Sequence, residues 1–189
     1  MNKRIFAAIK LNFNSEIVEN INKLKKNLSS EKIKWVDTSH IHLTLFFFGE
    51  TSGNKVSQIS DLLELVCNKY SSFELKTNTL GVFRNFINPT VLWVGLNKCN
   101  ELELIYNDLL KKIDTLGYKP DYENFSPHIT IGRINFVSNL EKFKKIILSK
   151  ELCFAQTEKI SEIILYESIL KPTGAQYIEL KKYPLISNY

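Results

Sequence analysis

Two short runs of strand-forming residues each carry a histidine and a threonine two positions apart. The first run is HLTLFFFG, which contains His42 and Thr44, and the second is HITIGR, which contains His128 and Thr130. Successive side chains on a β-strand point to opposite faces, so residues two positions apart share a face. Each run therefore combines an aliphatic face suited to a core with a face that presents one imidazole and one hydroxyl. A chain with two such strands has to bury one face of each and leave the other accessible.

Chance alone is a poor explanation for this repetition. The chain has three histidines, and two of them begin the His-x-Thr-aliphatic pattern. With ten threonines among 189 residues, a given histidine has a threonine two positions later about one time in twenty. One such pair is most often a structural histidine, but two in matching strand contexts indicate a shared site.

The chemistry of the two residue types points to phosphate esters. Histidine serves as a general base or a general acid near neutral pH. Two imidazoles on either side of one phosphorus can deprotonate an attacking water and protonate a leaving oxygen. Threonine hydroxyls can donate hydrogen bonds to the non-bridging phosphate oxygens. Two facing His-x-Thr units would thus make a complete phosphoesterase site without a metal ion.

Hydrophobic periodicity predicts a chain in which strands and helices follow one another without a linker. Strands are expected at 4–11, 33–36, 41–49, 73–80, 91–96, 128–134 and 176–180, with two more between 154 and 165. Helices are expected from 15 to about 28, from 55 to 66 after Gly53 and Asn54, from 102 to near Gly117, and from 140 to 147. The continuous apolar strand at 91–96 is of the kind covered on both faces. The two halves form a coarse duplication, each with helices, several strands and one His-x-Thr strand.

Charge and composition describe an ordinary globular protein with a mild basic bias. The net charge is +5 and the pI is about 9.0. This suits an anionic partner such as RNA, although a lysine-rich solvated surface would give the same values. The N-terminal apolar run is broken at Lys10, too early for a signal peptide, and no stretch reaches the length of a membrane span. We therefore expect a cytoplasmic protein that does not enter a membrane.

The quoted runs and their surroundings resemble the 2H phosphoesterase superfamily, and within it the RNA 2′,3′-cyclic phosphodiesterase family, also known as 2′-5′ RNA ligases. The resemblance covers nearly the whole chain. The matching blocks are RIFAAI, WVDTSHIHLTLFFFGET, GVFRNFINPTVLWVGL, FSPHITIGR and LYESILKPTGAQYIELKKYPL. Together they are far more specific than the two His-x-Thr pairs alone.

The resemblance implies an α+β, bilobal fold in which two antiparallel sheets line a central groove, with helices on the outside. Residues 1–189 would form a single domain of two pseudo-symmetric lobes. His42 is implied to be the proton donor and His128 the proton acceptor, each with its threonine, Thr44 or Thr130. The implied reaction opens a terminal 2′,3′-cyclic phosphate on RNA and leaves a 2′-phosphate, with no metal and no organic cofactor. The expected partner is such an RNA end, and the expected state is a monomer.

Several other residues are candidates for substrate binding. Arg133 matches a common family position, but on a regular strand it would face away from His128, so a bulge or a strand end is needed to bring it to the phosphate. Phe48, Phe83 and Phe125 could stack on a nucleobase. Phe46 stands where the family often has a basic residue, which reduces the positive charge expected near the groove.

Alternative functions stay open at this point. The same four histidine and threonine side chains would serve a 2′-5′ RNA ligase or a phosphodiesterase for another cyclic nucleotide. A non-catalytic RNA-binding module could keep the groove without the chemistry. A zinc site is a further alternative, because His40 lies two residues before His42 and could join it and His128 as a ligand. No fourth ligand is apparent for such a site, and the threonines would go unexplained.

Overall fold

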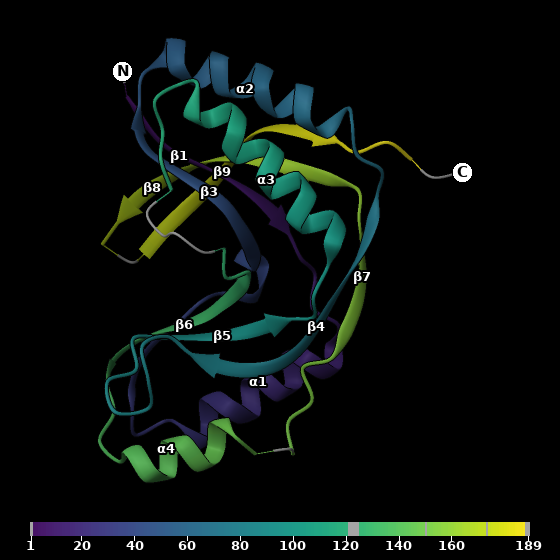
Figure 1. Ribbon diagram of the computed structural model, residues 1–189. Helices are drawn as coiled ribbons and strands as arrows, with labels where there is room; N and C mark the ends of the chain where they lie inside the picture. The colour runs from purple at the N-terminus through teal and green to yellow at the C-terminus, as the bar shows by residue number, and fades with distance from the viewer. Residues whose placement is uncertain (1, 121–124, 150, 173, 188–189) are drawn as a thin grey trace.

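Figure 1 shows the computed structural model of the chain, which describes residues 2–120, 125–149, 151–172 and 174–187. The strands in this part are β1 Lys3–Lys10, β2 Lys32–Trp35, β3 His42–Thr51, β4 Phe73–Val82, β5 Val91–Leu96, β6 His128–Phe136, β7 Gln156–Ile160, β8 Glu162–Lys171 and β9 Gly174–Pro184. The helices are α1 Ser15–Asn27, α2 Gly53–Cys67, α3 Asn100–Asp114 and α4 Leu140–Ile147, with a short 3₁₀ turn, η1, at Thr38–His40. Each element predicted from periodicity has a counterpart among these.

The strands form one antiparallel sheet in the order β7-β4-β5-β6-β3-β1-β8-β9, and β2 pairs with β6 outside this path. Its two halves meet where β3 pairs with β6, through the single register pair Leu43 and Ile129. The α+β class with antiparallel strands around a concave face is confirmed. The two sheets expected from the sequence are the two halves of one hydrogen-bonded sheet, and they join at the two strands that carry the His-x-Thr pairs.

The helices lie on the outside of the curved sheet (Figure 1). Helices α2 and α3 lie together over the half formed by β1, β3, β8 and β9, and α1 and α4 lie below the other half. Asn14 caps α1 by accepting a 2.9 Å hydrogen bond from the backbone N–H of Ile17. In the part of the chain that the structure describes, no helix is both long and apolar enough to cross a membrane.

Alternating burial along the central strands separates the core from the concave face. Leu43 and Ile129 are fully buried between the sheet and the helices, whereas the histidines and threonines beside them are half-buried on the other face. Strand β5 was predicted to be covered on both faces, and this is wrong. Leu92 is fully buried, but Trp93 is half-exposed, because an antiparallel sheet with helices on one side leaves its concave face open. The division into two pseudo-symmetric lobes stays a prediction.

Candidate active site

A β-bulge in β3 decides which side chains reach the concave face after Thr44. In the pairing with β1, Ala7 lies opposite Phe46 and Ala8 opposite Thr44, so Leu45 has no partner of its own. Leu45 and Phe46 consequently both point into the core, where they are 4% and 6% exposed. Phe47 then returns to the face that carries His42 and Thr44, with 39% of its surface exposed.

Strand β6 contains a bulge at the equivalent position. Leu92 of β5 pairs with Gly132 and Trp93 pairs with Thr130, so Ile131 is the extra residue. Ile131 and Gly132 are both buried, and Arg133 emerges exposed on the face of His128 and Thr130. This is the irregularity that the sequence required if Arg133 was to reach the groove. In both strands, the fifth residue after the histidine shares the face of the His-x-Thr pair.

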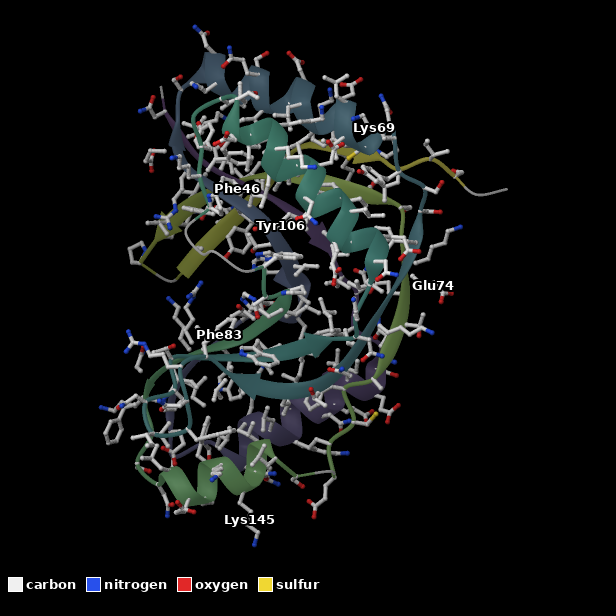
Figure 2. The ribbon with its side chains drawn as sticks, viewed as in Figure 1. Phe46, Lys69, Glu74, Phe83, Tyr106 and Lys145 are labelled. Carbon is white, nitrogen blue, oxygen red and sulfur yellow. The ribbon has the colours of Figure 1, made fainter. Side chains whose placement is uncertain are left out.

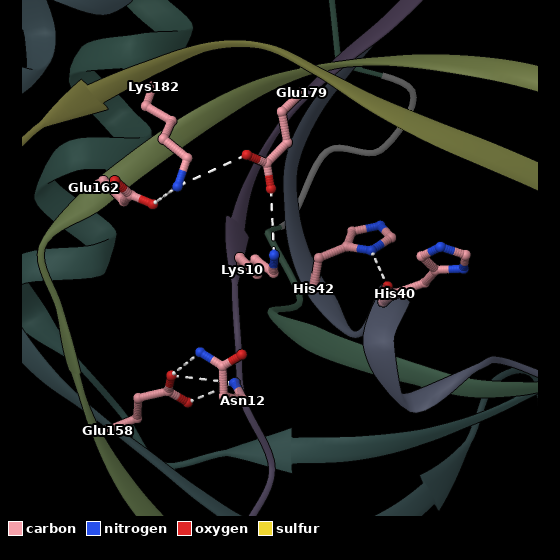
Figure 3. A network of polar contacts seen from close by, with 8 residues as sticks. All are labelled: Lys10, Asn12, His40, His42, Glu158, Glu162, Glu179 and Lys182. Carbon is pink, nitrogen blue, oxygen red and sulfur yellow. Dashed lines mark hydrogen bonds and ion pairs between the residues drawn. The ribbon is translucent and has the colours of Figure 1, made fainter.

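The two imidazoles are held in the same way. Nδ1 of His42 lies 2.7 Å from the carbonyl oxygen of His40, and Nδ1 of His128 lies 2.8 Å from that of Ser126. A carbonyl can only accept, so each Nδ1–H donates and each Nε2 is left for the concave face. Figure 3 shows the bond between the His42 ring and the His40 backbone. Both histidines therefore present the same nitrogen, in the same tautomer, to a ligand between the strands.

Aromatic rings fix the orientation of each imidazole. The ring of His128 meets Phe83 nearly edge to face, with centroids 4.5 Å apart and planes at 85°. Figure 2 labels Phe83 on the concave side of β5, where it lies above the sheet. The ring of His42 meets Tyr177 at 5.1 Å and 84°, and Phe6 lies at 5.1 Å. Such packing restricts rotation of the imidazoles.

Burial is the main cause that lowers the pKa of both histidines below the usual 6.5. The accepting backbone carbonyls act in the opposite direction. The positive charge of Arg133 lowers the pKa of both rings further, and charge on His40 and His128 adds to this at His42. Arg133 is thus within electrostatic reach of both imidazoles. A bound anion would relieve this repulsion, so the electrostatics of the site favour a phosphate.

One of the predicted aromatic contacts lies elsewhere. Phe48 was proposed to stack on a nucleobase, but it is 6% exposed in the core, with its ring 4.8 Å from Phe46 and 5.2 Å from Tyr118. The bulge at Leu45 turned it away from the groove and placed Phe47 there instead. Phe46 itself lies in the core, so its side chain does not line the groove and does not affect the charge there.

Phe125 packs against helix α3. Its ring stacks on Tyr106, with centroids 3.7 Å apart and planes at 10°. The two rings line a small hollow with Pro127 on the side of the molecule that carries α3. Figure 2 labels Tyr106 on α3, above the concave face. A role for Phe125 in binding a base stays a prediction.

The sequence analysis missed three aromatic residues of the concave face. Tyr166 of β8 and Tyr177 of β9 pack around His42 and Phe6. Trp93 pairs with Thr130 and lies over Gly81, where an added Cβ would come within 2.2 Å of the indole ring. The sequence held one signal for them: alternation along QYIEL places Tyr177 and Glu179 on one face, but nothing local shows which face is concave.

The alternative zinc site would need His40, His42 and a further ligand together. His40 lies at the end of η1, and its ring packs against Tyr177, with centroids 5.7 Å apart. Among residues 2–120, 125–149, 151–172 and 174–187, no three His, Cys, Asp or Glu side chains converge as metal ligands do. The described geometry thus gives no support to a three-residue metal centre at this position.

Comparisons with known proteins agree with the geometry. A sequence profile of the 2′-5′ RNA ligase superfamily matches residues 13–156. The RNA 2′,3′-cyclic phosphodiesterase of Thermotoga maritima is 32% identical over 180 residues, covering 92% of this chain and 91% of the relative. That of Methanocaldococcus jannaschii is 32% identical over 181 residues, covering 95% and 99%. A crystal structure of E. coli LigT complexed with 3′-AMP superposes with a TM-score of 0.76 at 25% identity, covering 98% of this chain and 99% of that one. The chain therefore belongs to the 2′-5′ RNA ligase superfamily, as its paired His-x-Thr strands indicated.

Proposed function

We propose that the chain hydrolyses the 2′,3′-cyclic phosphodiester at the end of an RNA and leaves a 2′-phosphomonoester. The observation that carries the proposal is the pairing of two His-x-Thr units on adjacent strands, with both Nε2 atoms on one concave face. The names of the relatives, RNA 2′,3′-cyclic phosphodiesterase, support the same reaction. The positive net charge of +5 suits an anionic RNA. We assign the activity to a single chain acting in the cytoplasm.

The reaction needs one base and one acid. Nε2 of His128 accepts a proton from water while the water oxygen attacks phosphorus. The bond from phosphorus to O3′ breaks in line with this attack, and protonated His42 donates its Nε2 proton to O3′. The phosphate stays on O2′, and the two histidines have exchanged protonation states. Solvent then restores the starting state.

The hydroxyls and the guanidinium would act on the phosphate itself. Thr44 and Thr130 share a face with their histidines, so their hydroxyls can donate to the non-bridging oxygens. Negative charge concentrates on these oxygens during displacement, and fixed donors stabilise it. Arg133 adds a positive charge that already acts on both imidazoles. We assign these three residues to phosphate binding.

The test uses an oligoribonucleotide that ends in a 2′,3′-cyclic phosphate. Phosphorus NMR of the product distinguishes a 2′-phosphate from a 3′-phosphate, and the proposal requires the 2′ product. A 3′-phosphate product would mean that the ribose lies between His42 and His128 in the opposite orientation to the one proposed. The reaction is repeated with EDTA, which should leave the rate unchanged. A rate lost on chelation and restored by zinc would support the metal alternative instead, and no turnover of any cyclic end would overturn the hydrolase.

A further inference from the structure

A pocket opens beside His42 on the side away from His128. Its volume is about 250 Å³, and it lies between the edge strand β9 and the 3₁₀ turn η1. The residues that line it are Lys10, Ser39, His40, Ile41, His42, Tyr166, Tyr177 and Glu179. The acid–base chemistry proposed above uses His42 alone among them. The remaining residues are available to bind the part of a substrate that extends beyond the phosphate.

The wall of this pocket is aromatic and rigid. Phe6, Ala8, Ile164 and Tyr166 form a small buried apolar cluster on the concave face, with Tyr177 packed against it. Phe6 stacks on Tyr166 with centroids 5.1 Å apart and planes at 16°, and Tyr177 stands at 74° to Phe6. A half-buried ring fixed in this way is a surface on which a nucleobase can stack.

One carboxylate is held inside the pocket. Oε1 of Glu179 lies 3.3 Å from Nζ of Lys10, and Oε2 lies 3.7 Å from Nζ of Lys182 (Figure 3). The Tyr166 hydroxyl is a further neighbour, and the Glu179 carboxylate contributes to raising the pKa of that hydroxyl. An ionised carboxylate has about four lone-pair sites, so these three neighbours leave it able to accept one more donor. An ionised carboxylate can accept hydrogen bonds but cannot donate them.

The orientation of the substrate connects the pocket to the reaction. If His42 protonates O3′, the ribose that carries O3′ lies on the His42 side of the phosphorus, next to this pocket. We propose, on the basis of the function proposed above, that the pocket holds the base of the terminal nucleoside. We propose further that Glu179 selects bases with an exocyclic amino group, namely adenine, cytosine and guanine, over uracil.

The selection follows from donor and acceptor chemistry. Adenine N6, cytosine N4 and guanine N2 each carry an amino group that a carboxylate can accept from. Uracil presents carbonyl oxygens at the corresponding positions. Its one donor on that edge, N3–H, stands between O2 and O4, so a carboxylate that approaches it is repelled by an oxygen on either side. Tyr177 would contribute stacking to every base alike, because each base has an aromatic face.

The test compares hydrolysis of the four nucleoside 2′,3′-cyclic monophosphates. We expect kcat/KM for uridine to be about tenfold below that for the other three. Glu179→Gln keeps the size but adds a donor, so the ratio between adenosine and uridine should fall to near one. Tyr177→Leu should raise KM about tenfold for all four substrates. Tyr177→Phe keeps the ring and should behave as the unmodified chain does.

Two matched controls lie outside the pocket, one on helix α2 in contact with β9 and one on β9 itself. Glu64 of α2 pairs with Lys181 of β9 at 2.7 Å and does not line the pocket, so Glu64→Gln removes a similar ion pair elsewhere. Ile178 is 40% exposed on the opposite face of β9 from Tyr177, so Ile178→Ala tests damage to the strand alone. Both variants should keep the base preference and the KM values unchanged.

Failure of this inference can be told apart from failure of the proposed function. Equal kcat/KM for uridine and adenosine, or a preference that survives Glu179→Gln, would overturn the assignment of the pocket while the hydrolase stands. If no cyclic nucleotide is hydrolysed, the proposed function fails, and calorimetry with adenosine and uridine 2′-monophosphates tests the pocket alone. Tighter binding of the adenosine compound that Glu179→Gln abolishes would support the pocket, and equal binding would overturn it.

Discussion

The two motif strands share their backbone and differ in their surroundings. Both β3 and β6 place a histidine and a threonine on the concave face, carry a bulge after the threonine, and bind Nδ1 to the carbonyl two residues earlier. The fifth residue after the histidine is Phe47 in one strand and Arg133 in the other. The guanidinium of Arg4 lies over the Phe47 ring at 4.7 Å, so β1 supplies the cation on that side.

The environments of the two imidazoles differ more than their geometry. His42 is the more enclosed of the two, with Phe6, Tyr166 and Tyr177 around its ring and the pocket beside it. His128 has Phe83 as its aromatic neighbour. The similar backbone of the two strands therefore presents two imidazoles in the same way, and their different surroundings would allow the different roles that we propose for them. The enclosed side suits the nucleoside, and the other side suits water.

Removing either imidazole should have the largest effect. His42→Ala and His128→Ala are each expected to lower kcat at least about a hundredfold, because a positioned acid or base contributes that much or more. Their residual activities should differ in pH dependence. Loss of the base, His128, should abolish the acidic limb of the pH–rate profile, and loss of the acid, His42, the basic limb.

These variants also test whether the two strands divide the roles at all. Both side chains face the groove, so circular dichroism should show an intact fold in each variant. If His42→Ala hydrolysed the cyclic phosphate at the unmodified rate, the whole two-histidine assignment would be lost. If the limbs disappeared in the reverse order, the pairing of His42 with the leaving oxygen would be wrong, while the shared site would stand.

The threonines should show the next largest effect, and the same one in both strands. Thr44→Val and Thr130→Val keep the side-chain shape and remove the hydroxyl, so each should lower kcat by about tenfold to a hundredfold. KM should change much less, because the hydrogen bonds strengthen as charge builds on the phosphate oxygens. Steady-state kinetics on a cyclic-phosphate oligonucleotide measures both. A rise in KM with kcat unchanged would make the hydroxyls binding groups only.

Arg133 and Phe47 occupy equivalent places and should respond differently. Arg133→Leu is expected to raise KM about tenfold through loss of a charge-assisted contact with the phosphate. Because the positive charge of Arg133 lowers the pKa of both histidines, its removal should also move the kcat/KM profile to higher pH. Arg133→Lys should retain the position of the profile. Phe47→Leu should move neither, and a shift with Phe47→Leu would mean that packing, not charge, sets the profile.

The order of elements and the two His-x-Thr pairs could be predicted from the sequence because both depend on local patterns. The bulges could not, because a bulge is a matter of register with a partner strand, and Leu45 and Ile131 look like ordinary alternating residues. This is why Phe48 was assigned to the groove in place of Phe47. The pocket beside His42 also could not be predicted from the sequence, because it forms between β9 and η1, two segments far apart in the chain.

The smallest expected effect concerns pH in the unmodified chain. The proposed mechanism requires neutral His128 and protonated His42 in the free protein, so kcat/KM should be bell-shaped, with two apparent pKa values that belong to the pair. Burial and Arg133 hold both pKa values below 6.5, so the maximum should lie on the acid side of that value. In the complex, the phosphate anion between the imidazoles raises both pKa values, so the kcat profile should lie at higher pH than that of kcat/KM. The free energy of unfolding should fall as pH drops below about 6.5, because the unfolded chain then binds more protons at these histidines than the folded one. Urea titrations across this pH range measure the free energy of unfolding, and the His128→Gln variant shows how much of its pH dependence comes from that histidine. If the two kinetic profiles coincided, the bound phosphate would lie too far from the imidazoles to act on either of them.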